Sequence, residues 1–389
     1  MSAALIEDAK HILGNLVAFP TVSHESNLAM VDYMADFLRQ LGARVFLQHN
    51  EDGQKANLFA TLGPQRDGGV VLSGHSDVVP VEGQDWSSDP FMLLESNGRL
   101  YGRGTCDMKG FLACCLATAR DAAELNLERP LHFAFTYDEE VGCFGAQALV
   151  RELARRNIKP AAALIGEPTM MQVIEGHKGC YEYTTNFVGL EGHGSGPELG
   201  VNAIQYAARF ITHLMDLGEE LKGRAMAGSR FDPPWATIQV GRIAGGTGRN
   251  IIAGHCSVEW EMRPVQPSDA AFVKESLETF VNKQLLPSMK AVSSTAGIET
   301  IIVGEVEGLQ VVAQSEARDI AFEITGANGA DVVAFGTEAG LFQESGISAI
   351  ICGPGSIEQA HKPNEFVEID QLRICLKMLS RLQSKLAYR

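Results

Sequence analysis

Residues 69–77 read GVVLSGHSD, a short apolar run that gives way at once to histidine and aspartate. The first five of these residues predict a buried strand, because the run is short, glycine-bounded and rich in β-branched residues. Residues 131–137 and 162–165 repeat the pattern, and polar residues follow each of them. Helical patterns at 108–125 and 146–155 separate these runs. This alternation predicts an α/β fold with a mainly parallel sheet flanked by helices.

The composition restricts the class of protein. The chain has 389 residues, enough for two domains of ordinary size, and 45% hydrophobic with 21% charged residues is typical of globular proteins. The net charge of −16 argues against a nucleic-acid partner, which needs a basic surface. No apolar run approaches the roughly 18 residues of a membrane-spanning helix, and the beginning does not resemble a secretory signal. We therefore expect a cytoplasmic protein without a membrane partner.

The order of the predicted elements changes near residue 180 and changes back near residue 305. In between, the pattern is β-α-β-β-α-β, which is the ferredoxin-like order. Its elements are strand 181–188, helix 201–217, strands 236–243 and 256–262, helix 270–285 and strand 299–303. We therefore expect a discontinuous catalytic domain, residues 1–179 and 305–389, with a ferredoxin-like α+β domain, residues 180–304, inserted into it.

Several polar residues follow the predicted strands or begin a predicted helix. The candidates are His75, Asp77, Asp107, Glu139, Glu140, Glu167 and His361. Each alone has an ordinary interpretation: Asp107 suits a helix cap, and consecutive acids suit a solvated turn. Ligands of open α/β sheets, however, bind beyond the carboxyl ends of the strands, so we expect these side chains to meet in one crevice.

Two histidines with several carboxylates suit a pair of divalent ions, Zn²⁺ first and Co²⁺ or Mn²⁺ as alternatives. Five ligands suffice for two ions only if one carboxylate bridges them. In an extended chain His75 and Asp77 point to the same side, so the carboxylate can fix the imidazole tautomer.

The chain has no H-E-x-x-H motif, nucleophile elbow or Walker loop. We interpret the eight cysteines as reduced, mostly core residues, with Cys106 a weak candidate nucleophile.

With these motifs in this order, the sequence resembles the di-zinc amidohydrolase and exopeptidase family over nearly its whole length. The resemblance implies that His75 and Glu167 hold one zinc ion and that Glu140 and His361 hold the other. Asp107 would bridge the two ions.

The resemblance also implies roles for residues that bind no metal. Asp77 would orient the first histidine, and Glu139 would be the general base that takes a proton from the attacking water. In the inserted domain, His193 would stabilise the oxyanion in the neighbouring subunit's site, which implies a homodimer formed through this domain. Asn250 and Arg263 would hold the substrate's α-carboxylate, for which arginine offers a matching planar fork. Relatives carry serine directly after the histidine, where this chain has glycine.

Within the family, the likeness is greatest to the deacetylases that act on N-acetylornithine, and it includes residues 335–342 and 353–363. We therefore expect hydrolysis of an N-acyl amino acid, above all N-acetylornithine to ornithine and acetate, a step of arginine biosynthesis. Glu338 is a candidate acidic wall for ornithine's δ-ammonium group. The closest alternative is a related acylase, desuccinylase or carboxypeptidase that acts on another N-acyl amino acid or a dipeptide. An alternative of another class is a silent metal- or ligand-binding homologue, which the intact Glu139 disfavours.

Overall fold

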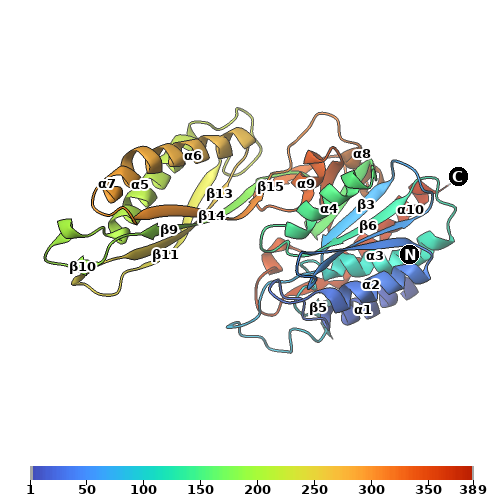
Figure 1. Ribbon diagram of the computed structural model, residues 1–389. Helices are drawn as coiled ribbons and strands as arrows, with labels where there is room; N and C mark the ends of the chain where they lie inside the picture. Colours follow the sequence, from blue (N-terminus) through green and yellow to red (C-terminus); the bar gives the residue numbers. More distant parts are fainter. Residues whose placement is uncertain (1–2, 388–389) are drawn as a thin grey trace. The chain divides into compact units, whose positions relative to one another are not determined.

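The computed structural model describes residues 3–387, which divide into two compact units. The inserted unit comprises His177–Gly308 together with Val333–Gly336, and the main unit comprises the rest. The insert therefore starts three residues earlier and ends four residues later than the range expected from the sequence, and a short return segment joins it. Figure 1 shows the two units, each with its own sheet and helices.

An eight-stranded sheet forms the centre of the main unit, in the order β1-β2-β6-β3-β7-β16-β8-β15. The strands are β1 (Arg44–His49), β2 (Ala56–Leu62), β3 (Val70–His75), β6 (Leu131–Thr136), β7 (Ala162–Pro168), β8 (Ile174–His177), β15 (Asp331–Val333) and β16 (Ser348–Gly353). The adjacent strands β6, β3, β7 and β16 are parallel, whereas β1 and β2 are antiparallel additions at one edge. The predicted α/β class with a mainly parallel sheet is confirmed.

Strand β2 was not predicted from the sequence, because the polar Asn57 interrupts its apolar run. The structure buries Asn57 completely, and its amide nitrogen donates to the carbonyl oxygen of Gly145 (2.8 Å) and the side chain of Gln48 (3.0 Å). A buried polar side chain with partners is tolerated inside a sheet. One partner lies on the neighbouring strand β1 and the other is 88 residues away, so the apolar pattern around Asn57 could not reveal them.

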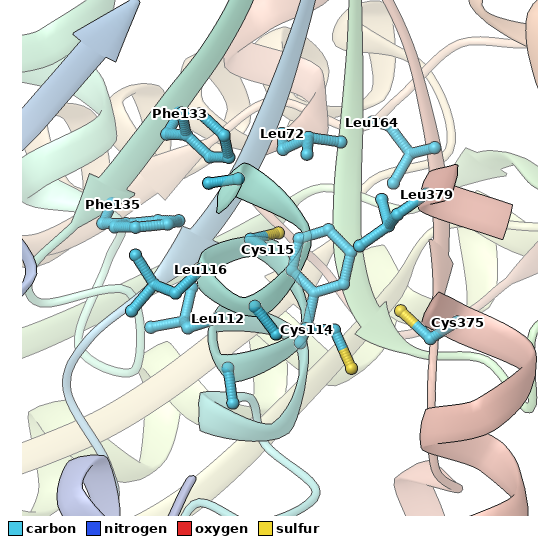
Figure 2. Close-up of a cluster of buried hydrophobic side chains, with 14 of the residues drawn as sticks. Leu72, Leu112, Cys114, Cys115, Leu116, Phe133, Phe135, Leu164, Cys375 and Leu379 are labelled. Atoms are coloured by element: carbon cyan, nitrogen blue, oxygen red, sulfur yellow. The ribbon is translucent and has the colours of Figure 1, made fainter. Parts of the chain in front are cut away.

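Helices cover the sheet of the main unit. They are α1 (Ala3–Val17), α2 (Leu28–Gln40), α3 (Lys109–Glu124), α4 (Phe144–Arg155), α8 (Glu316–Thr325), α9 (Ala339–Glu344) and α10 (Ile369–Leu386). Helix α3 is the most enclosed, since it packs against the sheet and against α1 and α10. In Figure 2, Leu112 and Leu116 lie on the side of α3 that faces Phe135, while Cys114 lies toward Cys375 of α10. These cysteines are core residues, as expected.

The main unit also contains a small three-stranded sheet in the order β17-β5-β4. Its strands are β4 (Leu94–Ser96), β5 (Arg99–Tyr101) and β17 (Phe366–Glu368), and β17 pairs antiparallel with β5. This sheet was not predicted, because three-residue strands are too short to show a period. It joins two segments that are more than 260 residues apart in sequence.

The inserted unit has a four-stranded antiparallel sheet in the order β11-β13-β9-β14. Its main elements are β9 (Cys180–Val188), α5 (Ala203–Lys222), β11 (Thr237–Gly245), β13 (His255–Arg263), α6 (Pro267–Phe280) and β14 (Gly297–Val306). Shorter elements are β10 (Gly192–His193), β12 (Ile251–Ile252) and α7 (Leu286–Lys290). Buried residues alternate along β9 and β13, as in a sheet covered on one face. The element and strand orders confirm the predicted ferredoxin-like arrangement.

No helix within residues 3–387 is both long and apolar enough to cross a membrane.

Candidate functional site

The candidate site lies at the carboxyl edge of the four parallel strands. His75 is the last residue of β3, Glu139 and Glu140 follow β6, and Glu167 is the penultimate residue of β7. His361 lies in the loop that follows β16. Because the strands are adjacent and parallel, their carboxyl ends meet at one edge and bring these side chains together. The sheet order therefore explains why residues nearly 290 positions apart are neighbours.

Asp107 lies between the two histidines. Its Oδ1 is 3.0 Å from Nε2 of His75, and its Oδ2 is 3.4 Å from Nε2 of His361. On the His75 side, Oε1 of Glu167 is 3.7 Å from Nε2; on the His361 side, Oε2 of Glu140 is 3.0 Å from Nε2. The structure therefore gathers two sets of candidate ligands that share one carboxylate.

Asp77 supports the site in two ways. Its backbone carbonyl oxygen accepts a hydrogen bond from Nδ1 of His75 (2.9 Å), so Nε2 is the ring nitrogen that faces the Asp107 carboxylate. Its carboxylate is 3.7 Å from Nδ1 and instead accepts from the Ser23 hydroxyl (2.7 Å) and from the backbone N–H groups of Glu139 (3.1 Å) and Glu140 (3.4 Å). The carboxylate thus fixes the turn that carries both glutamates, a contact that sequence spacing did not predict.

The site concentrates negative charge away from water. Burial raises the pKa of Glu139 well above its ordinary value, and the charges of Glu140 and Asp107 add to this against the opposing charge of His75. Burial likewise raises the pKa of Glu167. Oε1 of Glu140 and Oε1 of Glu167 are buried without a hydrogen-bond partner. Buried, unpartnered carboxylate oxygens next to imidazole nitrogens are the donor set that fits divalent cations.

The neighbouring carboxylates also change the pKa values of the two histidines. Hydrogen bonds with Asp107 and Glu140 raise the pKa of His361 to about 10, although partial burial opposes its charged form. Burial also opposes the charged form of His75, but the hydrogen bond with Asp107 and the nearby charge of Glu167 outweigh it and raise its pKa. Each imidazole therefore occupies a position where positive charge is stabilised.

Four supporting residues were missed in the sequence. Lys55 bonds to the carboxylate of Asp138 and to the backbone carbonyl of Ser23, which ties the glutamate turn to the chain before α2. Arg103 and Glu365 form an ion pair in which both side chains are about 1% exposed. Glycines on both sides of Arg103 were a weak signal of close packing. For Ser23, Lys55 and Glu365 the sequence offers no signal, because their partners are far along the chain.

Cys106 is not placed to act as a nucleophile. Its thiol donates to the backbone carbonyl of Ser356 (3.2 Å). Burial raises the pKa of this thiol well above its ordinary value, and the charges of Glu365 and Asp107 raise it further. Since the thiolate is the reactive form, the structure favours the core interpretation.

The expectation for Glu338 is wrong. Its side chain is buried, with Oε1 accepting from the Ser73 hydroxyl (2.5 Å) and Oε2 from the Thr136 hydroxyl (2.8 Å). Both oxygens are therefore engaged with strands β3 and β6, and none is offered to a substrate ammonium group. The residue precedes the short helix α9, and its acidic character alone misled the sequence interpretation.

In the inserted unit, His193 and Asn250 are neighbours. His193 pairs with Ile251 across β10 and β12, and the N–H of Gly194 donates to the backbone carbonyl of Asn250 (2.8 Å). A Cβ at Gly194 would lie 2.9 Å from that carbonyl oxygen, so the close approach accounts for glycine at this position. Both side chains are exposed, and Nδ1 of His193 contacts the Ser195 hydroxyl (2.7 Å).

Arg263 lies at the other end of this unit's sheet. It is the last residue of β13, whereas the loops that carry His193 and Asn250 adjoin the His255 end (Figure 1). The eight steps from His255 to Arg263, at ~3.3 Å each, separate the two ends of the strand by about 26 Å. The Arg263 guanidinium contacts Oε2 of Glu261 at 2.8 and 3.1 Å. The structure thus joins two of the three predicted residues and separates the third from them.

Comparison with known proteins agrees with the sequence resemblance. The model of peptidase family M20/M25/M40 matches residues 71–385. The acetylornithine deacetylases of Photorhabdus laumondii and Proteus mirabilis are 33% and 34% identical to this chain over 374 residues, covering 94% of each protein. The chain therefore belongs to the M20/M25/M40 peptidase family and is a metal-dependent hydrolase.

Solved structures share the fold. An M20 family metallo-carboxypeptidase from Sulfolobus solfataricus superposes with a TM-score of 0.75 at 19% identity, covering 97% of this chain and 99% of that one. A Bacillus subtilis protein described as a dinuclear metal-binding peptidase of the M20 family gives 0.64 at 15% identity, covering 99% of both chains. At this identity, the likeness concerns the fold alone.

Proposed function

We propose that the chain removes the acyl group from an N-acyl amino acid, with N-acetylornithine as the preferred substrate and ornithine and acetate as products. The observation that carries the proposal is the pair of ligand sets that share Asp107, beside the half-buried Glu139. The choice of substrate is supported by relatives that are described as acetylornithine deacetylases and are about one-third identical over 94% of the chain. The reaction would then be a step of arginine biosynthesis, and the reduced core cysteines favour a cytoplasmic location.

The proposed cofactor is a pair of divalent ions. His75, Glu167 and Asp107 would hold one ion, and His361, Glu140 and Asp107 would hold the other. Zinc is the first choice, because imidazole and carboxylate ligands without thiolate suit Zn²⁺ and also accept Co²⁺ or Mn²⁺. Such ions lower the pKa of a water molecule and polarise the scissile carbonyl group.

Glu139 is the proposed general base. Its carboxylate accepts a proton from the attacking water and returns it to the departing amine, and its position next to the ligand cluster and its raised pKa suit both steps. The backbone bond from Glu139 to the Asp77 carboxylate (3.1 Å) fixes the turn that orients it.

In the inserted unit, Arg263 would bind the substrate's α-carboxylate and His193 would stabilise the oxyanion, with Asn250 also contacting the substrate. A separation of about 26 Å along β13 exceeds the span of a single acyl amino acid. Two inserted units must therefore contribute if all three residues serve one substrate, which supports a homodimer formed through this unit.

Mixing two inactive variants tests the homodimer. Glu139→Gln removes the base, and His193→Ala removes the oxyanion donor. If His193 acts in the neighbouring subunit, each mixed dimer has one intact site, so equal mixing after reversible dissociation restores about a quarter of wild-type activity. If both residues act within one subunit, mixing restores nothing.

Kinetics on a panel of substrates tests the reaction and its specificity. N-acetylornithine is compared with other N-acetyl, N-formyl and N-succinyl amino acids and with dipeptides, while the metal content is measured in parallel. The proposal predicts the highest kcat/KM for N-acetylornithine. A higher value for a succinylated substrate or a dipeptide would assign the chain to a related desuccinylase, acylase or carboxypeptidase. If chelation and zinc add-back change no amidase activity, the silent-homologue alternative would stand.

A further inference from the structure

Three loops of the main unit meet beside the candidate metal ligands, around the buried pair of Arg103 and Glu365. The loops comprise residues 80–86, 102–107 and 361–365. Strand β5 leads directly into the second loop, the third loop leads directly into strand β17, and these two strands are paired. We name the two side chains the Arg103–Glu365 clasp. Nothing in the proposed reaction uses either side chain directly.

The carboxylate of Glu365 is saturated with hydrogen bonds from the second loop. Its Oε1 accepts from the backbone N–H groups of Cys106 (2.8 Å) and Asp107 (3.0 Å). Its Oε2 accepts from the backbone N–H of Gly104 (2.9 Å) and from Nη1 of Arg103 (2.8 Å). Because a charged acceptor binds N–H groups more tightly than a neutral one, this carboxylate fixes the backbone from which the Asp107 side chain projects.

Arg103 extends the clasp toward the third loop. Its Nη1 also donates to the backbone carbonyl of Lys362 (3.3 Å), and its Nη2 donates to Oε1 of Gln84 (2.6 Å). The amide nitrogen of Gln84 in turn donates to the backbone carbonyl of His361 (3.0 Å). The backbones of Asp107 and His361 are therefore joined by one continuous set of hydrogen bonds.

The two candidate histidines differ in how much they need such a connection. The His75 side chain is 1% exposed and ends a strand of the central sheet. The His361 side chain is 54% exposed and projects from a loop residue with φ of +61°, in the left-handed region. The strand holds His75 without help, whereas the position of His361 depends on what anchors its loop.

We propose that Glu365 is a positioning residue that sets the separation of Asp107 and His361, and so the affinity for the cation that these two residues hold with Glu140. The proposal rests on the proposed two-ion site. It assigns the clasp chiefly to this ion, because both Asp107 and His361 depend on the clasp, whereas the other ion would share only Asp107 and has its remaining ligands, His75 and Glu167, on strands β3 and β7.

The test is the zinc affinity of Glu365→Gln, measured without substrate. The amide replaces one acceptor oxygen with an NH₂ group that faces donors, so the four hydrogen bonds can no longer all form. In zinc-buffered titrations with the bound metal counted by mass spectrometry, we expect one of the two sites to lose about 10- to 100-fold in affinity while the other site loses clearly less. Excess zinc should restore most of kcat.

Two further variants make the test specific. Glu368→Gln lies three residues away and removes an exposed pair with Arg99, so both zinc affinities should match those of the wild type. Gln84→Ala removes the link to the His361 backbone but leaves the Glu365 carboxylate intact. It should weaken the same site by a smaller factor, and it keeps the proposal testable if Glu365→Gln fails to fold.

The outcomes separate this proposal from the one on which it rests. Two zinc ions bound by Glu365→Gln with wild-type affinities would overturn the positioning role. An equal loss at both sites, together with a lower unfolding midpoint of the metal-free protein, would also overturn it, because a general loss of structure explains that result. If the wild-type protein itself binds fewer than two zinc ions, the proposed two-ion site fails instead.

Discussion

The two units hold their candidate functional residues in opposite ways. In the main unit, the acidic side chains are buried or half-buried, and hydrogen bonds fix the backbone that carries them: Asp77 holds the turn of Glu139 and Glu140, and Glu365 holds the loop of Asp107. In the inserted unit, His193 and Asn250 project from exposed loops that are joined only through their backbones. The main unit therefore has a preorganised candidate site, whereas the candidate groups of the inserted unit are exposed to solvent.

This difference has an energetic reason. A cluster of buried carboxylates is costly unless cations and hydrogen bonds compensate it, so the surrounding structure must hold every member in place. Exposed groups carry no such cost and need no rigid support. Substitutions of the residues that hold Asp107 or the glutamate turn of the main unit should therefore change metal binding as well as catalysis. Substitutions of His193, Asn250 or Arg263 in the inserted unit should change substrate handling and leave the metal content unchanged.

The largest effect is expected for Glu139→Gln, which removes the proposed base but keeps the shape of the side chain. We expect kcat to fall by about 10²- to 10⁴-fold with two metal ions still bound. Turnover assays and metal analysis check this, and the exposed Glu124→Gln serves as the control. Near-normal kcat with a full metal complement would remove Glu139 from the mechanism.

Acid should destabilise both units through one buried histidine in each. Burial lowers the pKa of His132 in the main unit and of His177 in the inserted unit to about 4. The unfolded chain takes up these protons near pH 6.5, so the stability due to each neutral imidazole is complete above pH 6.5 and is lost as the pH falls toward 4. The loss is at most about 3 kcal/mol per histidine.

Urea unfolding of the chelator-treated protein at pH 7 and pH 5 measures this loss. Each of the substitutions His132→Asn and His177→Asn should lower the free energy of unfolding below that of the wild type. This difference should be smaller at pH 5 than at pH 7. If the units unfold separately, each substitution should shift a different transition. A difference from the wild type that does not vary with pH would contradict the expectation.

Gly166→Ala should destabilise the main unit. A Cβ at this position would lie 2.0 Å from the ring of Phe111, which is completely buried in α3. Overpacking of this kind costs about 1–3 kcal/mol. The unfolding midpoint should fall, and the neighbouring Glu167 should shift enough to weaken zinc binding. Gly297→Ala in the inserted unit, where a Cβ has open space, is the matched control.

The smallest effect is expected for Arg263→Lys. Lysine keeps the charge but loses the planar fork that pairs with a carboxylate. We expect KM to rise about tenfold, a loss of about 1.4 kcal/mol in binding, with little change in kcat, metal content or unfolding midpoint. A fall in metal content instead would show that the two units do not divide their roles as the comparison indicates.

Much of the fold could be predicted from the sequence, because it depends on local periodicity. Strand β3 and helix α3 have apolar patterns that specify their type within a few residues, and the β-α-β-β-α-β order of the insert is visible in the same way. The seven candidate site residues of the main unit were also visible, since each follows a strand or begins a helix. The periodic pattern, however, did not reveal β2 or the three-stranded sheet.

The amino-acid sequence by itself determined which residues are candidates for the chemistry: imidazoles and carboxylates at strand ends. The tertiary structure alone decided which acids belong to the site. Glu338 proved to be an internal hydrogen-bond acceptor, Glu365 proved to anchor Asp107, and Asp77 proved to hold the glutamate turn. The physical reason is that the role of a carboxylate depends on its burial and its partners. Those partners lie tens to hundreds of residues away, where only the folded sheet brings them into contact.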